Sequence, residues 1–152
     1  MKIIFGCDPN AKQLKKDLMT CAEEWGHEVI DYGSDDPIYA NTAIKVATDV
    51  AAGMAERGVL LCGTGIGMSI AANKVKGAYA ALLSDGYSAE RAILSNDSNI
   101  ACIGALTIGS KLAQLLLKTW LSQTFDPESR SRDKVARYKT YDMYRTCSEE
   151  CV

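Results

Sequence analysis

Several features are absent from this sequence, and each absence excludes a class of protein. No apolar run is long enough to cross a membrane, and no signal-peptide pattern stands at the N-terminus. None of the six cysteines forms a CxxC pair, which disfavours a zinc site or thioredoxin-like chemistry. The cysteines are also too widely scattered for a small disulfide scaffold. We therefore expect a cytoplasmic protein in which most of them are small buried residues.

An excess of charge of either sign is also absent. The net charge of -2 gives no reason to expect nucleic acid or an anionic membrane as a partner. Any anionic ligand must then be held by local donors. The 152 residues are 47% hydrophobic and 24% charged, as expected for one globular domain that buries a core without disulfides or metals.

Apolar runs and helical periodicity alternate along the chain. Short apolar runs bounded by glycines or polar turns predict five strands, at 3–5, 28–32, 58–62, 78–83 and 100–103. Segments with apolar residues at helical spacing follow them, at 14–25, 43–54, 66–75, 87–94 and 107–122. The alternation predicts a three-layer α/β/α Rossmann-like fold with a five-stranded parallel sheet, in which ligands bind at the carboxyl ends of the strands.

The last part of the chain departs from this alternation. Residues 125–152 begin with a polar, charged segment and then regain a helical pattern through Val135, Tyr138 and Tyr141. A charge run of this kind is usually a solvated face. We predict a C-terminal helical extension of the same domain that reaches away from residues 1–124.

A glycine-rich loop follows the most apolar predicted strand. In the segment 62–69, a cysteine is followed by glycines at 63, 65 and 67, and the loop opens the next predicted helix. Backbone N–H groups at a helix start have no partner within the helix and can bind an anion. The loop has neither the GxGxxG spacing nor the lysine of a nucleotide-binding loop, so a nucleotide site is the weaker interpretation. The alternative is a tight turn that binds nothing.

Cys62 stands at the mouth of this helix start. The helix dipole favours the thiolate there, which makes Cys62 a candidate base or nucleophile. The alternative is a small buried residue at the end of a strand.

The segment 61–74, Leu-Cys-Gly-Thr-Gly-Ile-Gly-Met-Ser-Ile-Ala-Ala-Asn-Lys, closely resembles the signature of the ribose-5-phosphate isomerase B and galactose-6-phosphate isomerase family. The segments 5–8, 87–90 and 96–99 and the basic tail extend the resemblance over nearly the whole chain. It implies an aldose–ketose isomerase that acts on a small phosphorylated sugar through a cis-enediolate, without a metal or cofactor. It also implies a homo-oligomer, a dimer or a tetramer, in which the tail packs on a neighbouring subunit.

The same resemblance assigns chemical roles within the glycine loop. Cys62 is implied to take the proton from the substrate carbon, and Thr64 to lie beside it. The amides of residues 63–67 are implied to hold the enediolate oxygens. Preorganised amides stabilise a developing anion without having to reorient, so the implied role agrees with the physical interpretation of the loop.

The resemblance also implies residues that bind the substrate. Asp8 and Asn96 correspond to residues that bind substrate hydroxyls, and Arg130 and Lys134 to basic residues that reach the phosphate in a neighbouring subunit. The complete predicted substrate-binding set is Asp8, Gly63, Gly65, Ile66, Gly67, Ser69, Asn96, Arg130 and Lys134.

This chain departs from the family pattern at several positions. Family members commonly have a histidine directly after the first aspartate and another directly before the Asn-Asp pair, where this chain has Pro9 and Ser95. The second histidine is thought to help open the cyclic sugar. A four-carbon sugar phosphorylated on O4 cannot close a five-membered ring and needs no ring opening. The absence of the second histidine therefore favours a tetrose phosphate as substrate. Segments such as 89–92 and 123–126 resemble the erythrulose-4-phosphate isomerase branch, and Leu106 stands where members often have an arginine.

The single histidine of the chain is not placed for catalysis. His27 lies in a predicted turn between a helix and a strand, far from the strand carboxyl ends. We interpret it as a surface turn residue.

Three classes of function stay open. The first is an active isomerase. The second is a non-catalytic phosphosugar-binding subunit of a hetero-oligomeric isomerase, which the missing histidines favour and the intact Cys62 disfavours. The third is a flavin or nucleotide-binding domain that shares only the architecture.

Overall fold

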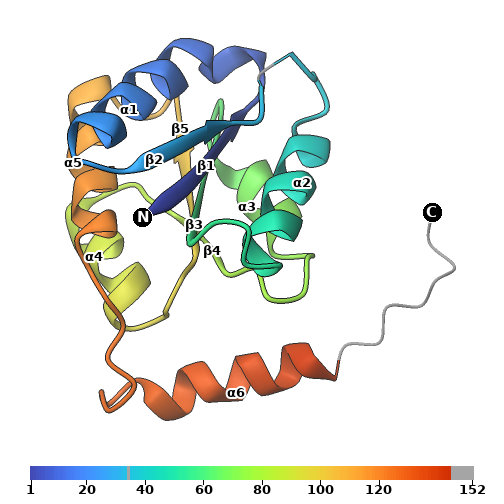
Figure 1. Ribbon diagram of the computed structural model, residues 1–152, viewed down its shortest axis with the longest axis vertical. Coiled ribbons are helices and arrows are strands. Elements are labelled where there is room, and N and C mark those ends of the chain that lie inside the picture. Colours follow the sequence, from blue (N-terminus) through green and yellow to red (C-terminus); the bar gives the residue numbers. More distant parts are fainter. Residues whose placement is uncertain (34, 145–152) are drawn as a thin grey trace, which may run out of the picture.

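The computed structural model describes residues 1–33 and 35–144, and Figure 1 shows how the helices and strands are arranged. Residue 34 and residues 145–152, which hold Cys147, Cys151 and the end of the predicted tail, lie outside the described residues. The strands are β1 (Lys2–Cys7), β2 (Glu28–Asp31), β3 (Arg57–Cys62), β4 (Ala80–Leu82) and β5 (Ile100–Gly104). The helices are the 3₁₀ turn η1 (Pro9–Ala11), α1 (Lys12–Glu24), α2 (Tyr39–Ala51), α3 (Ile66–Ala72), α4 (Gly86–Leu94), α5 (Ser110–Leu121) and α6 (Arg132–Met143).

The five strands form one parallel sheet in the order β2-β1-β3-β5-β4. Helices α1, α4 and α5 cover one face, and α2 and α3 cover the other (Figure 1). Successive side chains of a strand point to opposite faces, so β3 directs Val59 and Leu61 to the first face and Leu60 and Cys62 to the second. This three-layer arrangement confirms the predicted Rossmann-like fold.

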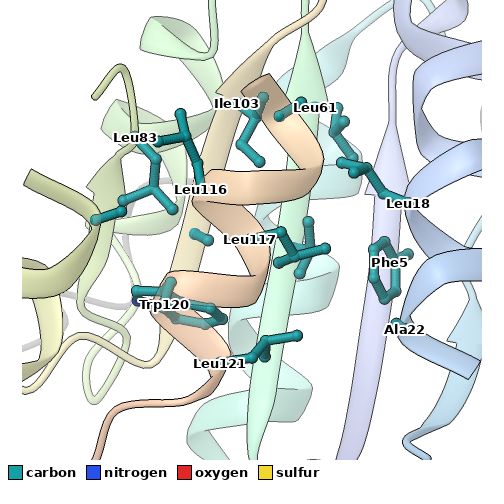
Figure 2. Packing of buried hydrophobic residues seen from close by; sticks show 14 of the residues in the cluster. Phe5, Leu18, Ala22, Leu61, Leu83, Ile103, Leu116, Leu117, Trp120 and Leu121 are labelled. Carbon is teal, nitrogen blue, oxygen red and sulfur yellow. The ribbon is translucent and has the colours of Figure 1, made fainter. Parts of the chain in front are cut away.

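The larger core lies between the sheet and the helices α1, α4 and α5, and α5 contributes its largest side chain, Trp120. Figure 2 shows Leu116, Leu117 and Trp120 among the α5 side chains that face the sheet, where Leu61 and Ile103 lie. All five side chains are fully buried. Trp120 keeps its polar atom satisfied, because its indole N–H donates to the Ser98 hydroxyl at 2.9 Å. This helix therefore fixes the face of the sheet that is opposite Cys62.

The predicted elements agree with the observed ones apart from their ends. The predicted helix 107–122 begins only at Ser110. Thr107 forms a turn instead, with its amide 3.3 Å and its hydroxyl 3.1 Å from the Gly104 carbonyl oxygen. Periodicity does not register such a turn, because Thr107 and Ile108 continue the apolar pattern of the helix. None of the helices in the described part of the chain is long and apolar enough to cross a membrane.

Helix α6 does not reach away from the domain as predicted. The Asp142 carboxylate accepts a hydrogen bond of 2.6 Å from the Gly77 amide, and the Tyr138 hydroxyl donates to the Asn96 carbonyl. Val135 is buried as well. The partners of α6 precede β4 and β5, so the helix lies across the amino edge of the sheet (Figure 1). It therefore lies away from the edge where the strands end.

His27 lies in the turn between α1 and β2, as predicted, but it is partly buried there. Its Nδ1 atom is buried and has no hydrogen-bond partner within the residues described above. Burial and the charge of the N-terminal amino group lower the pKa of His27. It directly precedes β2, so it lies at the amino edge and not beside Cys62.

We expect Leu117→Ala to lower the free energy of unfolding by about 2–5 kcal/mol, because it leaves a cavity in the core under α5. Leu115→Ala, on the same helix but 58% exposed, is the matched control and should change stability by less than about 0.5 kcal/mol. Urea denaturation of both variants measures the difference. Equal effects would show that α5 does not pack as described.

Candidate active site

Asp8 and Cys62 lie side by side at the carboxyl edge of the sheet. Strand β1 pairs with β3 so that Gly6 is opposite Leu60, and the ladder continues with a 3.1 Å hydrogen bond from the Asp8 amide to the Leu61 carbonyl. Leu60 and Cys62 belong to the core under α2 and α3, and Gly6 faces the same helix α2. Alternation then directs Asp8 to the same face as Cys62, on a neighbouring strand about 4.8 Å away.

The Asp8 carboxylate is held in one orientation. Asp8 is only 6% exposed. Its Oδ1 accepts a 2.9 Å hydrogen bond from the Asn10 amide, and its Oδ2 accepts a 3.2 Å bond from the Asn10 side chain. A carboxylate fixed in this way can accept hydrogen bonds from hydroxyl groups of a ligand without first losing conformational freedom.

The loop after β3 directs one backbone donor at the Cys62 thiol. Gly65 adopts a positive φ of 78°, and its amide lies 3.1 Å from the Cys62 sulfur. The Ile66 amide donates to the Thr64 hydroxyl oxygen at 3.3 Å. Within the part of the chain that the structure describes, the amides of Gly67 and Met68 have no acceptor. The loop therefore places one amide donor at the sulfur and leaves others free to donate to a bound group.

The surroundings of Cys62 differ from those of its neighbouring cysteines. Burial raises the pKa of Cys7 to about 11, and burial likewise raises the pKa of Cys102. Both side chains are fully buried in the two cores. Cys62, at the end of its strand, is the thiol of these three that receives a hydrogen bond from a loop amide.

The loops that follow the strands carry negative charge. Their carboxylates are those of Asp8, Asp35, Asp36 and Asp85. No lysine or arginine occurs in the segments that directly follow the strands, which are residue 8 and residues 32–38, 63–65, 83–85 and 105–109. Lys12, in the first turn of α1, pairs with Asp35 at 2.6 Å. Lys15 is buried and pairs with Asp31. A phosphate bound at this edge therefore lacks an uncommitted cation in the adjoining loops.

Comparison with known proteins shows what kind of site this is. Residues 3–138 match the Ribose/Galactose Isomerase family. The chain belongs to that family. It is a sugar-phosphate isomerase, and the family predicted from the segment 61–74 is confirmed.

The relatives match the isomerase over nearly its whole length. Ribose-5-P isomerase B of Listeria innocua is 48% identical over 146 residues, which cover 94% of this chain and 98% of the relative. D-erythrulose-4-phosphate isomerase 2 of Mycolicibacterium smegmatis is 42% identical over 150 residues, which cover 93% and 97%. The solved structure of ribose-5-phosphate isomerase B of Clostridium thermocellum has a TM-score of 0.88 at 36% identity and covers 94% of this chain and 98% of that one. These matches disfavour the flavin or nucleotide-binding alternative.

The structure brings most of the predicted site residues of the isomerase together. Asp8, Cys62 and the loop 63–67 meet at the carboxyl edge. Ser69 lies one turn into α3, where its hydroxyl donates to the Ala80 carbonyl of β4 at 3.4 Å. Ser69 therefore joins α3 to the sheet and does not point freely into the site.

Asn96, Arg130 and Lys134 lie at the opposite edge of the sheet. Asn96 is exposed, and its side-chain amide donates to the Arg91 carbonyl at 3.0 Å. Arg130 and Lys134 flank the start of α6, are exposed, and form no ion pair within residues 1–33 and 35–144. The length of β5, roughly 15 Å, separates the two edges. One chain by itself does not bring these three residues to Cys62.

The structure adds two large side chains that the sequence did not indicate. A Cβ atom on Gly65 would lie 2.6 Å from Leu82 Cδ1, and one on Gly67 would lie 2.5 Å from the Tyr39 ring. Both side chains come from elements far from the loop in sequence, and no spacing signal connects them to it.

No cluster of three or more His, Cys, Asp or Glu that is able to hold a metal occurs among the described residues.

We expect iodoacetamide at about pH 8 to alkylate Cys62 at least about ten times faster than Cys7 or Cys102, since the thiolate is the reactive form. Cys7 should react slowly at this pH, because its side chain is fully buried and burial raises its pKa to about 11. Peptide mass spectrometry after timed quenching measures each rate. Protein unfolded in guanidinium is the control, where the three thiols should react alike. Equal rates in the folded protein would contradict the assignment of Cys62 as the reactive thiol.

Proposed function

We propose that the isomerase interconverts the aldose and ketose forms of a small phosphorylated sugar through a cis-enediolate, with Cys62 as the base. The observation that carries this proposal is the Cys62 thiol with a loop amide 3.1 Å from its sulfur, at the end of the strand next to β1, which Asp8 directly follows. A base, a carboxylate and unpaired amides at one edge are the groups that proton transfer beside a carbonyl needs.

The thiolate removes the proton from the carbon next to the carbonyl carbon. The electron pair of that C–H bond forms the carbon–carbon double bond, and the carbonyl oxygen becomes negatively charged. The unpaired amides of Gly67 and Met68 support binding of this oxygen close to the loop. The thiol then returns the proton to the carbon that carried the carbonyl oxygen. No atom or electron is gained or lost overall.

A second proton must move between the two substrate oxygens. The Thr64 hydroxyl oxygen already accepts a hydrogen bond from the Ile66 amide, so its own hydrogen is available to donate. This supports a role for Thr64 in passing that proton. The fixed carboxylate of Asp8 accepts hydrogen bonds from sugar hydroxyls and orients the substrate.

A second copy of the chain supplies the phosphate-binding groups in this proposal. The loops around Cys62 carry aspartates and no lysine or arginine. Arg130 and Lys134 are exposed cations without an ion pair in the described part of the chain, and Asn96 lies at the same edge. Ile66 and Ile70 on α3 are 51% and 58% exposed beside the loop, as is typical of a surface that a partner covers. The number of subunits stays a prediction, as does the cytoplasmic location.

The alternative is a non-catalytic phosphosugar-binding subunit that works with a different chain. This alternative is favoured by Pro9 and Ser95, which stand where family members commonly have histidine. A chain of this kind would bind sugar phosphates without turning them over. The amide-bonded thiol of Cys62 has no evident use in such a subunit, which is why we prefer the active isomerase.

We expect Cys62→Ala to lower turnover by at least about a hundredfold while the circular dichroism spectrum and melting temperature stay those of the wild type. The paired variant Arg130→Ala/Lys134→Ala should also be inactive, through loss of phosphate binding. When equal amounts of the two inactive proteins are unfolded, mixed and refolded together, about half of the dimers should be hybrids, and one of the two sites in each hybrid holds both intact halves. The mixture should therefore regain about a quarter of the wild-type sites.

Each variant refolded alone is the control for this mixing experiment. Activity that fails to return in the mixture would show that Arg130 and Lys134 do not serve the site of a neighbouring chain. Substantial activity in Cys62→Ala alone would exclude Cys62 as the base.

We expect erythrose or erythrulose 4-phosphate to be isomerised with a higher kcat/KM than ribose 5-phosphate, because an open-chain tetrose phosphate needs no ring opening. Ser95 caps α4 at the edge that also holds Asn96, so a histidine there would serve the neighbouring site. Ser95→His should therefore raise the activity on ribose 5-phosphate selectively. Solvent deuterium incorporation into each sugar measures both effects, and a wild-type preference for ribose 5-phosphate of about tenfold or more would overturn the expectation.

A further inference from the structure

Tyr39 is the first residue of α2, and its ring packs against Gly67, just after the loop that follows β3. A Cβ atom placed on Gly67 would be 2.5 Å from Cε2 and 2.8 Å from the hydroxyl oxygen of Tyr39. The ring thus occupies the space that a side chain at Gly67 would need. Tyr39 is 42% exposed, so it covers the loop from the solvent side.

The position of α2 places Tyr39 above the strands that carry the site. Thr42, one turn further along α2, lies so close to β1 that a Cβ atom on Gly6 would be 2.6 Å from its methyl group. Residues at i and i+3 of a helix lie on one face, so Tyr39 lies beyond Thr42 toward the end of β1. That is the edge where Asp8 and Cys62 meet, on the face of the sheet that α2 covers.

The Tyr39 hydroxyl brings an unused polar group to this edge. Three other tyrosine hydroxyls are hydrogen-bonded within the domain: that of Tyr32 donates to Asp49 at 2.7 Å, and those of Tyr79 and Tyr138 donate to Asp142 and the Asn96 carbonyl. The Tyr39 hydroxyl has no partner in the part of the chain that the structure describes. The side chains packed on the other two loop glycines are apolar, Leu106 on Gly63 and Leu82 on Gly65.

We propose that the Tyr39 hydroxyl binds a hydroxyl group of the sugar phosphate and thereby determines which sugars the isomerase accepts. Gly67 lies two residues beyond Gly65, the residue whose amide contacts the thiol. The proposed contact therefore lies beside the loop, at a glycine other than the one whose amide contacts the thiol. This inference rests on the proposed function, because it needs the substrate to lie between Asp8 and the loop.

Tyr39→Phe tests the proposal, because it keeps the ring on Gly67 and removes only the hydroxyl. We expect kcat/KM for the preferred sugar phosphate to fall by about tenfold or more, mainly through a higher KM, while the melting temperature stays unchanged. Tyr32→Phe is the matched control, since it removes a hydroxyl that bonds to Asp49 away from the site. It should leave kcat/KM unchanged.

Monodeoxy analogues of the preferred sugar phosphate identify the contact. For the analogue that lacks the contacted hydroxyl, wild type and Tyr39→Phe should have equal kcat/KM. A purely structural role for Tyr39 predicts no such dependence on the sugar. Unchanged kcat/KM of Tyr39→Phe on every sugar phosphate tested would overturn the proposal.

The proposed function can fail separately from this inference. If the wild type turns over none of the sugars, calorimetric titration of the same sugar phosphates into wild type and Tyr39→Phe decides the role of Tyr39. Binding about tenfold weaker to the variant supports the contact with the hydroxyl. Equal binding to both proteins, or binding to neither, would overturn it.

Discussion

The parallel pairing of β1 with β3 is the constraint on which the site depends. It sets Gly6 opposite Leu60, and two residues later it brings the fixed Asp8 carboxylate and the Cys62 thiol to the same face. A shift of one residue in this register would turn one of the two side chains into the opposite core. Burial of apolar side chains on both faces, from Val59 to Leu61, makes such a shift costly. The stability of the core and the geometry of the site are thus the same requirement.

The loop after β3 sets the surroundings of the Cys62 thiol. Cys7 and Cys102 lie on the neighbouring strands, where burial raises the pKa of both thiols. Cys62 has the same side chain but stands where the chain turns, and the positive φ of Gly65 directs an amide at its sulfur. The three cysteines therefore differ in their surroundings: Cys7 and Cys102 are enclosed by the two cores, and Cys62 contacts a loop amide.

The distribution of charge gives the molecule two unlike ends. The carboxyl edge has aspartates and unpaired amides, and the amino edge has α6 with its exposed cations. An anionic substrate at the carboxyl edge is poorly matched by a single chain, because the uncommitted Arg130 and Lys134 lie at the far end of the strands. The same separation is well suited to a pair of chains in which each end meets the other.

Most of the fold was predictable because apolar runs and helical periodicity show which face of an element is buried. This pattern does not depend on which other element packs against that face. The ends of elements were less predictable: Thr107 continues an apolar pattern but forms a turn with Gly104. The extension at 125–152 was predicted as a helix, but its polar sequence gave no sign that Asp142 and Tyr138 would fasten it to the amino edge. The turn at His27 was predicted, but the burial of its Nδ1 atom was not, since burial by distant segments leaves no local pattern.

The sequence by itself determined the family, the parallel sheet, the Cys62 loop and the list of candidate substrate-binding residues, because these follow from contiguous motifs and periodic burial. Only the tertiary structure decided that Asp8 lies beside Cys62 while Asn96, Arg130 and Lys134 lie at the opposite edge. It alone also placed Tyr39 on Gly67. The physical reason is that strand order, register and helix crossing set distances between residues far apart in the chain, and these depend on how whole faces pack and not on any local spacing.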